Sequence, residues 1–178
     1  GSSRTGIANI ADLLCRMICG CIQMGVYPNF PEKYWIVTPV DFAANAIAHI
    51  SLSGGTGPYH IVVDHDKDAR HNDMFETINA LGFPVRRIDP ADWFEALATC
   101  SPDNALYPIT SYLLEKVHEG RNTILEAHYR TEACANTRTH EALAGSGTVV
   151  PTIDAELIAK YLSYFVSCGL IKRRAVTE

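Results

Sequence analysis

GSSRTGIANIADLLCRMICGCIQMGVYPNF, residues 1–30, joins a short polar loop directly to an amphipathic helix. Apolar residues recur every three or four positions from Ile7 to Cys21, which predicts one apolar helix face. Gly25 and Pro28 are expected to end this helix. Because no strand precedes it, we expect the stretch to belong to the middle of a larger fold.

The rest of the chain predicts an α/β protein that is rich in helices and has about three short strands. The expected strands are the apolar runs WIV (35–37), YHIVV (59–63) and VRRI (85–88). Further helices are expected to begin at Asp41, at Asn72 or Asp73, at Pro90 and at Leu106. Asp154 is expected to be the N-cap of the last helix. Residues 131–152 are expected to be mostly loop. Strands this short need partners, so they should pair with a missing sheet or with one another.

Composition narrows the class of protein. The 178 residues suit one domain, expected to span 1–178, and 47% of them are hydrophobic and 20% charged, as in ordinary globular proteins. The formal net charge of -5 gives no reason to expect a nucleic-acid partner. No apolar run reaches the roughly 18 residues of a membrane span, and no secretory signal is visible. We therefore expect no membrane partner and a cytoplasmic location.

The cysteines predict core packing and no chemistry. Cys15, Cys19 and Cys21 fall within the first expected helix, and Cys168 ends the last one. Cysteines placed in this way, without a secretory context, are expected to be reduced and to pack as small apolar residues. No histidine base accompanies them in a pattern typical of a nucleophilic cysteine.

One segment, HIVVDHDKDARH (60–71), combines three histidines with three aspartates. They are His60, His65 and His71 with Asp64, Asp66 and Asp68. A zinc site needs ligands that converge from defined positions, and this spacing does not make them converge. We therefore expect a solvated acidic loop and no metal site.

Motifs of catalysis and cofactor binding are missing. No GxGxxG, GxxxxGK[ST] or GxSxG occurs. SGGTGP (53–58) is rich in glycine, but a proline closes it and no helix follows, so it is not expected to hold a phosphate. Tyr112 and Lys116 have the spacing of a catalytic Tyr–Lys pair, but we expect them in one packed helix, where the spacing is a coincidence. The residues alone therefore predict no catalytic and no cofactor-binding group.

Seven segments, taken in order, resemble a known family. They are GSSRTGIANIADLLCRMICGCIQMGVYP (1–28), TPVDFAANAIAHIS (38–51), YHIVV (59–63), FETINALGFPV (75–85), WFEAL (93–97), LYPI (106–109) and PTIDAELIAKYLSYFVSCGLI (151–171). Together they resemble the C-terminal part of thioester reductase domains. These domains are relatives of extended short-chain dehydrogenases. They are found at the end of polyketide synthases, nonribosomal peptide synthetases and carboxylic acid reductases. The sequence is most similar to the fungal type.

The resemblance implies a helix-rich substrate lobe that completes a Rossmann fold. The complete domain in this family binds NADPH and reduces an acyl thioester, held on a carrier protein's phosphopantetheine arm, to an aldehyde or alcohol. The family's glycine-rich loop and Tyr–Lys pair have no match in this chain. The resemblance therefore implies an oxidoreductase as the parent, with NADPH in the complete domain, no metal, and an inactive chain when alone.

The same resemblance implies a set of substrate-facing residues in the first loop. They are Ser3, Arg4, Thr5, Gly6 and Asn9. A structural role stays open for them, because a loop before a helix can use Asn9 simply to bind backbone N–H groups. Asp41 is expected to be structural and to hold the start of a helix.

Positive charge is clustered in two places, Arg86–Arg87 and the tail Lys172–Arg174. Such residues are usually solvated, but Arg86 and Arg87 are the candidates for docking an acidic carrier protein. The other expected partner is the N-terminal cofactor half of the same domain. If YHIVV belongs to that missing sheet, an exposed strand edge could also cause self-association.

Two alternatives to a reductase stay open. One is a redox-inactive release domain of the same family that cyclises its product by a Dieckmann reaction. The other is a non-catalytic module that folds alone and docks the carrier protein. Residues upstream of this chain would decide between reduction and cyclisation.

Overall fold

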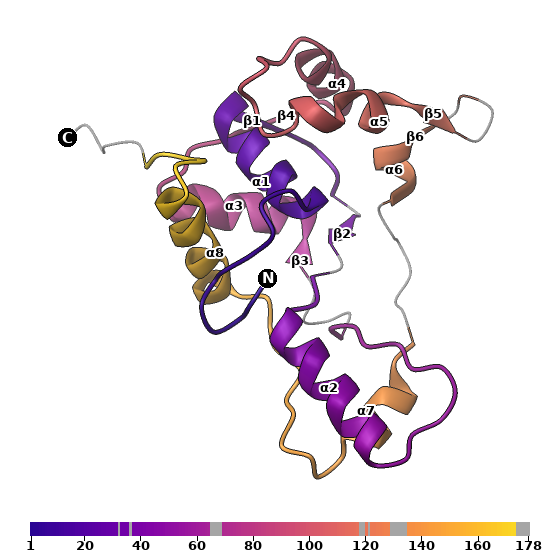
Figure 1. The fold of residues 1–178 in the computed structure, drawn as a ribbon. Coiled ribbons are helices and arrows are strands. Elements are labelled where there is room, and N and C mark those ends of the chain that lie inside the picture. Colours follow the sequence, from indigo (N-terminus) through magenta and orange to yellow (C-terminus); the bar gives the residue numbers. More distant parts are fainter. Residues whose placement is uncertain are drawn as a thin grey trace.

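Helices form most of the structure. The computed structural model describes residues 1–31, 33–35, 37–64, 69–117, 120, 122–128 and 135–173. The helices are α1 (Leu13–Met24), α2 (Val40–Leu52), α3 (His71–Ala80), α4 (Pro90–Ala98), the 3-10 turn η2 (Tyr107–Ile109), α5 (Thr110–Leu114), α6 (Ile124–His128), α7 (Thr137–Leu143) and α8 (Ala155–Ser167). Helices α1, α3, α4 and α8 surround one large hydrophobic core, whereas α2 and α7 enclose a small separate one (Figure 1).

The strands are very short and pair two at a time. β1 (Val26–Pro28) runs parallel to β4 (Arg86–Ile88), and β2 (Tyr34–Trp35) runs antiparallel to β3 (Ala69–Arg70). β5 (Lys116–Val117) and β6 (Asn122–Thr123) form a further antiparallel pair. The expected helix-rich fold with few strands is confirmed, and VRRI contains β4 as predicted. The described strands satisfy one another locally, which was one of the two expected outcomes.

Helix α1 begins later than its apolar pattern predicts. Ile7 and Ile10 do not extend its buried face, and their exposed fractions are 57% and 43%. Asn9 Oδ1 accepts from the Ala11 backbone N–H, and Asp12 caps the helix by accepting from the Leu14 N–H at 2.9 Å. These side chains compete with helical hydrogen bonding and fix the start at Leu13. The predicted end at Gly25 is correct, because Gly25 adopts the left-handed backbone with a φ of 73°.

The expected strand YHIVV is not a strand. Residues 59–64 form no regular secondary structure, and their backbone carbonyls bind α7 and the residue before it. The His60 carbonyl accepts from Thr139 Oγ1 at 2.9 Å, and the Val62 carbonyl accepts from Asn136 Nδ2 at 3.3 Å. Within 131–152 the described residues are mostly loop, as expected, but they also contain α7, which was not predicted.

Two other helix predictions need correction. Pro39, and not Asp41, is the cap residue of α2, so Asp41 lies inside its first turn. The helix expected to begin at Leu106 is replaced by the 3-10 turn η2 and the short α5, which ends at Leu114 because Glu115 is extended and leads into β5. Pro90 at the start of α4 and the Asp154 N-cap of α8 are confirmed.

Cysteines of α1 pack as expected. Cys15, Cys19 and Cys21 are buried, and burial raises the pKa of the Cys15 thiol to about 11 and that of Cys19 to about 12. Such thiols stay protonated near neutral pH and are poor nucleophiles. Cys168 differs from the prediction, because it lies exposed at the end of α8.

Among the core residues, His71 differs most from its expected position. It does not border a solvated loop; its side chain is fully buried at the start of α3. Trp35 Nε1 donates to His71 Nδ1 at 3.0 Å, so His71 Nε2 carries the proton and donates to the Pro28 carbonyl at 2.9 Å. Of the other residues in the proposed acidic loop, His65, Asp66 and Asp68 lie outside the described residues.

Candidate functional site

The first residues of the chain form a loop that folds back on itself and lies between α2 and α8. We call residues 1–9 the opening loop. The Gly1 carbonyl accepts from the Val40 N–H at 2.9 Å, and the Ser2 N–H donates to the Ile7 carbonyl at 2.9 Å. These bonds fold the loop back on itself and fasten its first residue to the start of α2 (Figure 1).

Asp41 is the main anchor of the opening loop. Its carboxylate accepts from the Ser3 N–H at 3.0 Å and from Ser3 Oγ at 2.8 Å, and Arg4 Nε lies 3.8 Å from Oδ2. Burial raises the pKa of Asp41, but the hydrogen bonds from Ser3 outweigh it and hold the pKa at about 2. Asp41 is therefore structural, as expected, but it fixes a loop 38 residues away and does not cap its own helix.

Helix α8 fixes the other side of the opening loop. Gly6 has a φ of 72°, and a Cβ built on it would lie 2.4 Å from the Lys160 carbonyl oxygen. Only glycine fits this close backbone approach. Lys160 Nζ also donates to the Ser3 carbonyl at 3.4 Å and pairs with Glu156 at 2.9 Å.

A pocket of about 180 Å³ lies beneath the opening loop. Its lining comes from the loop, from α1, from the residues before α2 and from α8. The lining residues are Gly1, Ala8, Asn9, Asp12, Leu14, Cys15, Ile18, Val37, Thr38, Tyr161 and Phe165. The lining therefore combines apolar side chains with the polar residues Asn9, Asp12, Thr38 and Tyr161.

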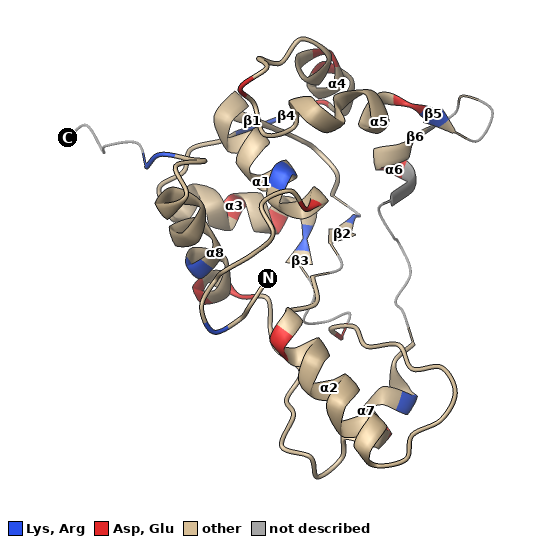
Figure 2. Ribbon diagram, in the orientation of Figure 1, with Lys and Arg blue, Asp and Glu red and all other residues tan. Residues whose placement is uncertain are grey.

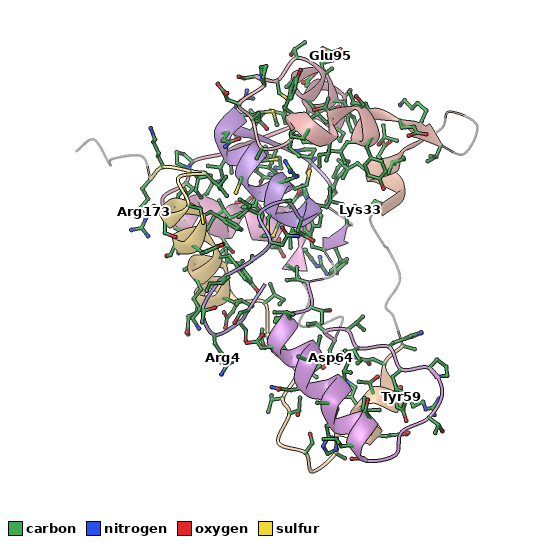
Figure 3. All side chains as sticks on the ribbon, viewed as in Figure 1. Arg4, Lys33, Tyr59, Asp64, Glu95 and Arg173 are labelled. Atoms are coloured by element: carbon green, nitrogen blue, oxygen red, sulfur yellow. The ribbon has the colours of Figure 1, made fainter. Side chains whose placement is uncertain are left out.

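The five candidate substrate-facing residues do not all reach this pocket. Asn9 lines it, whereas Ser3 and Gly6 are used to hold the loop against α2 and α8. Arg4 and Thr5 are exposed, and Figure 3 shows Arg4 on the outside of the loop between α8 and α2. Thr38 and Tyr161 were missed, because TPVD suggested only a helix start and Tyr161 occupies the apolar face of α8.

The two carrier-docking candidates are exposed on the parallel strand pair. Arg86 and Arg87 are adjacent in β4, so their side chains point to opposite faces. Arg87 Nη1 lies 3.7 Å from Glu76 Oε1 on α3. The structure therefore brings them to one edge but not to a single patch. Of the basic tail, Lys172 borders a second groove and Arg173 stacks on Phe83, while Arg174 lies outside the described residues.

Within the described part of the chain, the groups considered for catalysis or cofactor binding have other positions and contacts. Tyr112 lies in α5 and Lys116 in β5, so no single helix presents the pair. Arg138 from α7 donates to the Thr56 and Pro58 carbonyls of the SGGTGP loop and stacks on Tyr59 at 4.4 Å. That loop is filled by a guanidinium and does not fit a dinucleotide phosphate. In the described ranges, no group of three or more candidate ligands could hold a metal.

Comparisons with known proteins match this architecture. A family model described as Male sterility protein matches residues 1–47, which span the opening loop, α1 and the start of α2. The chain is 33% identical to aldehyde reductase lnaA of Aspergillus flavus over 92% of its own length. It is also 33% identical to the non-canonical nonribosomal peptide synthetase FrzA of Cladobotryum sp, over 95% of its own length.

A solved structure matches nearly the whole of this chain. The terminal R domain of the myxalamid PKS-NRPS pathway superposes with a TM-score of 0.79 at 31% identity, covering 98% of this chain and 43% of that one. The chain spans only 16% and 17% of the two curated relatives. The resemblance to the reductase (R) domains of nonribosomal peptide and polyketide synthetases, in the extended short-chain dehydrogenase/reductase family, is therefore confirmed. No helix in the described ranges is long and apolar enough to cross a membrane.

Proposed function

We propose that this chain is the substrate- and carrier-facing portion of an NADPH-dependent thioester reductase domain. The complete domain would release a carrier-bound peptide or polyketide thioester as an aldehyde or an alcohol. The observation that carries the proposal is the match of nearly the whole chain to a terminal R domain at 31% identity. The opening loop and its pocket then provide the surface that faces the acyl chain.

The chemistry divides between the two halves of the domain. NADPH bound by the other half would supply the hydride, and with one proton the thioester would be converted to an aldehyde and the carrier's free thiol. This chain's residues would hold the acyl chain and exclude water from it. Acid catalysis requires a group within hydrogen-bond reach of the reacting oxygen. We assign that group to the other half.

The chain on its own is expected to be inactive. Incubated with NADPH and the carrier-bound thioester, it should neither lower the absorbance of NADPH at 340 nm nor change the thioester as seen by intact-protein mass spectrometry. The complete reductase domain at the same concentration is the positive control. Steady turnover by the isolated chain, in the absence of any upstream residues, would contradict the assignment of catalysis to the other half.

Carrier docking is expected to depend on Arg86 and Arg87. Reversing both charges (Arg86→Glu with Arg87→Glu) should slow association with an acidic phosphopantetheinylated carrier domain and reduce its salt dependence. The single variants should differ, because Arg87 is paired with Glu76 and Arg86 faces the other side of the strand. Binding is measured by surface plasmon resonance at low and high salt.

A matched control for these variants lies elsewhere on the surface. Lys116→Glu also reverses an exposed positive charge, but in β5. It should leave the association rate unchanged. Equal association rates for the wild type and the Arg86→Glu, Arg87→Glu double variant would remove both residues from the docking surface.

A further inference from the structure

A groove of about 420 Å³ lies beside the C-terminal ends of α1 and α8 and the turn that follows α3. We call it the helix-end groove. Most of its lining is apolar, and the apolar side chains are Ile22, Met24, Phe83, Pro84, Leu170 and Ile171. Among the described residues that line it, Lys172 is the single charged one. The groove therefore offers apolar contacts next to one positive charge.

The segments around the helix-end groove carry positive charge and no negative charge. These segments are residues 20–29, 80–88 and 164–173. Their charged residues are Arg86, Arg87, Lys172 and Arg173, and they contain no Asp or Glu. The whole chain has 20 acidic residues against 15 Lys and Arg, so this separation is not a consequence of its composition. Figure 2 shows these basic residues in β4 and in the chain that follows α8.

Lys172 and Arg173 are the two cations placed directly at the groove. Lys172 lines it, and the Arg173 guanidinium lies 5.9 Å from the centre of the Phe83 ring, which is part of the lining. Both residues are exposed, and neither forms an ion pair within the part of the chain that the structure describes. Arg87 differs, because it pairs with Glu76. Lys172 and Arg173 are therefore available to the carboxylates of a partner.

An apolar groove with two cations beside it fits one kind of partner. An amphipathic helix that carries carboxylates next to its apolar side chains can lie in such a groove. Its apolar side chains would cover Met24 and Leu170, which are half-buried, while its carboxylates would meet Lys172 and Arg173. The opposite charges guide the encounter, and the apolar contacts add affinity.

The helix-end groove and the pocket beneath the opening loop lie at opposite ends of α1. Leu14 at the start of the helix lines the pocket, and Met24 at its end lines the groove. The helix rises about 15 Å between these two residues. Figure 3 likewise shows Arg4 and Arg173 at opposite ends of α8. A carrier docked at the groove would thus lie about one helix length from the pocket, a distance suited to its long flexible arm.

We propose that the helix-end groove, with Lys172 and Arg173, docks an acidic helix of the carrier protein. The proposal rests on the proposed function, which supplies the carrier as the partner. It adds a groove and two further cations to the docking candidates Arg86 and Arg87. No comparison assigns a role to these residues.

The test measures binding of the parent synthase's carrier domain to this chain by surface plasmon resonance, at low and high salt. The carrier is used without its phosphopantetheine arm, so that the pocket cannot contribute. Reversing both charges (Lys172→Glu with Arg173→Glu) should weaken binding about ten-fold at low salt and remove most of its salt dependence. Met24→Gln keeps the length of the side chain but makes it polar, and should weaken binding about three-fold at both salt concentrations.

A control and a second readout separate docking from a structural role. Cations near helix C-termini can also stabilise the helix ends. Circular dichroism therefore follows Tm in every variant, and Lys116→Glu reverses an exposed charge in β5, outside the groove. A lowered Tm with unchanged carrier affinity in the double variant would overturn the proposal. An equal loss of affinity in Lys116→Glu would also overturn it, because only the net charge would then matter.

The readout is binding and not turnover. Carrier binding that is weakened by the double variant and by Met24→Gln supports the groove even if the complete domain releases its product by cyclisation. An active reductase whose carrier affinity is the same in the wild type and in these variants overturns this inference and leaves the proposed function intact. The absence of carrier binding by the folded wild-type chain also overturns it.

Discussion

Replacing His71 by alanine is expected to lower the free energy of unfolding by about 3–5 kcal/mol, the range for an aromatic-to-alanine change in a core. The ring is fully buried and contacts the aromatic rings of Trp35, Phe30 and Phe75. Truncation leaves a cavity and removes the acceptor of the Trp35 N–H and the donor to the Pro28 carbonyl. Urea unfolding at pH 7.5 measures the effect.

His49→Ala is the matched control, because His49 is only partly buried on α2 and should cost less than about 0.5 kcal/mol. Equal losses for His49→Ala and His71→Ala would show that His71 does not hold β1, β2 and α3 together.

The same residue should make the protein sensitive to acid. Burial lowers the pKa of His71 from 6.5 to about 3, although the hydrogen bond to Pro28 acts in the opposite direction. The unfolded chain therefore binds a proton between these pH values when the folded chain does not. Stability from this group is complete above pH 6.5 and falls by about 1.4 kcal/mol per pH unit as the pH decreases toward 3. A His71→Phe variant should lack that part of the slope.

Replacing Asp41 by alanine is expected to cost about 2–3 kcal/mol, the value of hydrogen bonds to a charged acceptor. The carboxylate accepts from both the backbone and the hydroxyl of Ser3, and its side chain is only 15% exposed. Without it, the opening loop loses its anchor to α2. Hydrogen exchange at the Ser3 amide should accelerate by at least about ten-fold.

The pH dependence of Asp41 has the sign usual for an acid. Its folded pKa of about 2 lies below the ordinary 3.8, so its contribution is complete above pH 3.8 and is lost as the pH falls toward 2. Asp92→Ala is the control, because Asp92 also lies in the first turn of a helix, α4, but is exposed. If the Asp41→Ala variant unfolds at the same urea concentration as the wild type, and its Ser3 amide exchanges at the same rate, another residue anchors the opening loop.

Local signals in the sequence predicted some of the caps and breaks of the helices. Asp154 and Pro90 begin their helices as expected because capping depends on neighbouring residues alone. YHIVV failed because its β-branched residues fit any extended, half-buried segment, and only tertiary contacts decide what it binds. Its carbonyls bind Thr139 and Asn136, which lie more than 70 residues away.

The candidate site could be predicted only in part for a related reason. The resemblance selected the opening loop, and Asn9 does line the pocket. The opening loop, the segment that holds Thr38 and Asp41, and α8 with Tyr161 are three separate segments. A single sequence shows no sign that these segments meet. The substrate-binding role of Ser3, Arg4, Thr5, Gly6 and Asn9 stays a prediction.

Helix α2 exposes an apolar surface that a partner could cover. YHIVV forms no strand, so the expected strand edge is not the surface that would be covered. Instead, Val40, Ile47 and Leu52 on α2 are exposed, and Figure 2 shows this helix without charge beyond its first turn. Exposed apolar patches often mark an interface. Self-association and docking of the N-terminal cofactor half both stay predictions, now with this helix as the surface to test.

The most direct test of the central claim is a single-turnover assay of the complete domain with its own carrier-bound thioester and NADPH. Product is identified by mass spectrometry, with the isolated chain assayed in parallel. The account predicts an aldehyde or alcohol, formed only when NADPH is present and only by the complete domain. A cyclised product formed without NADPH would contradict it and favour the Dieckmann alternative.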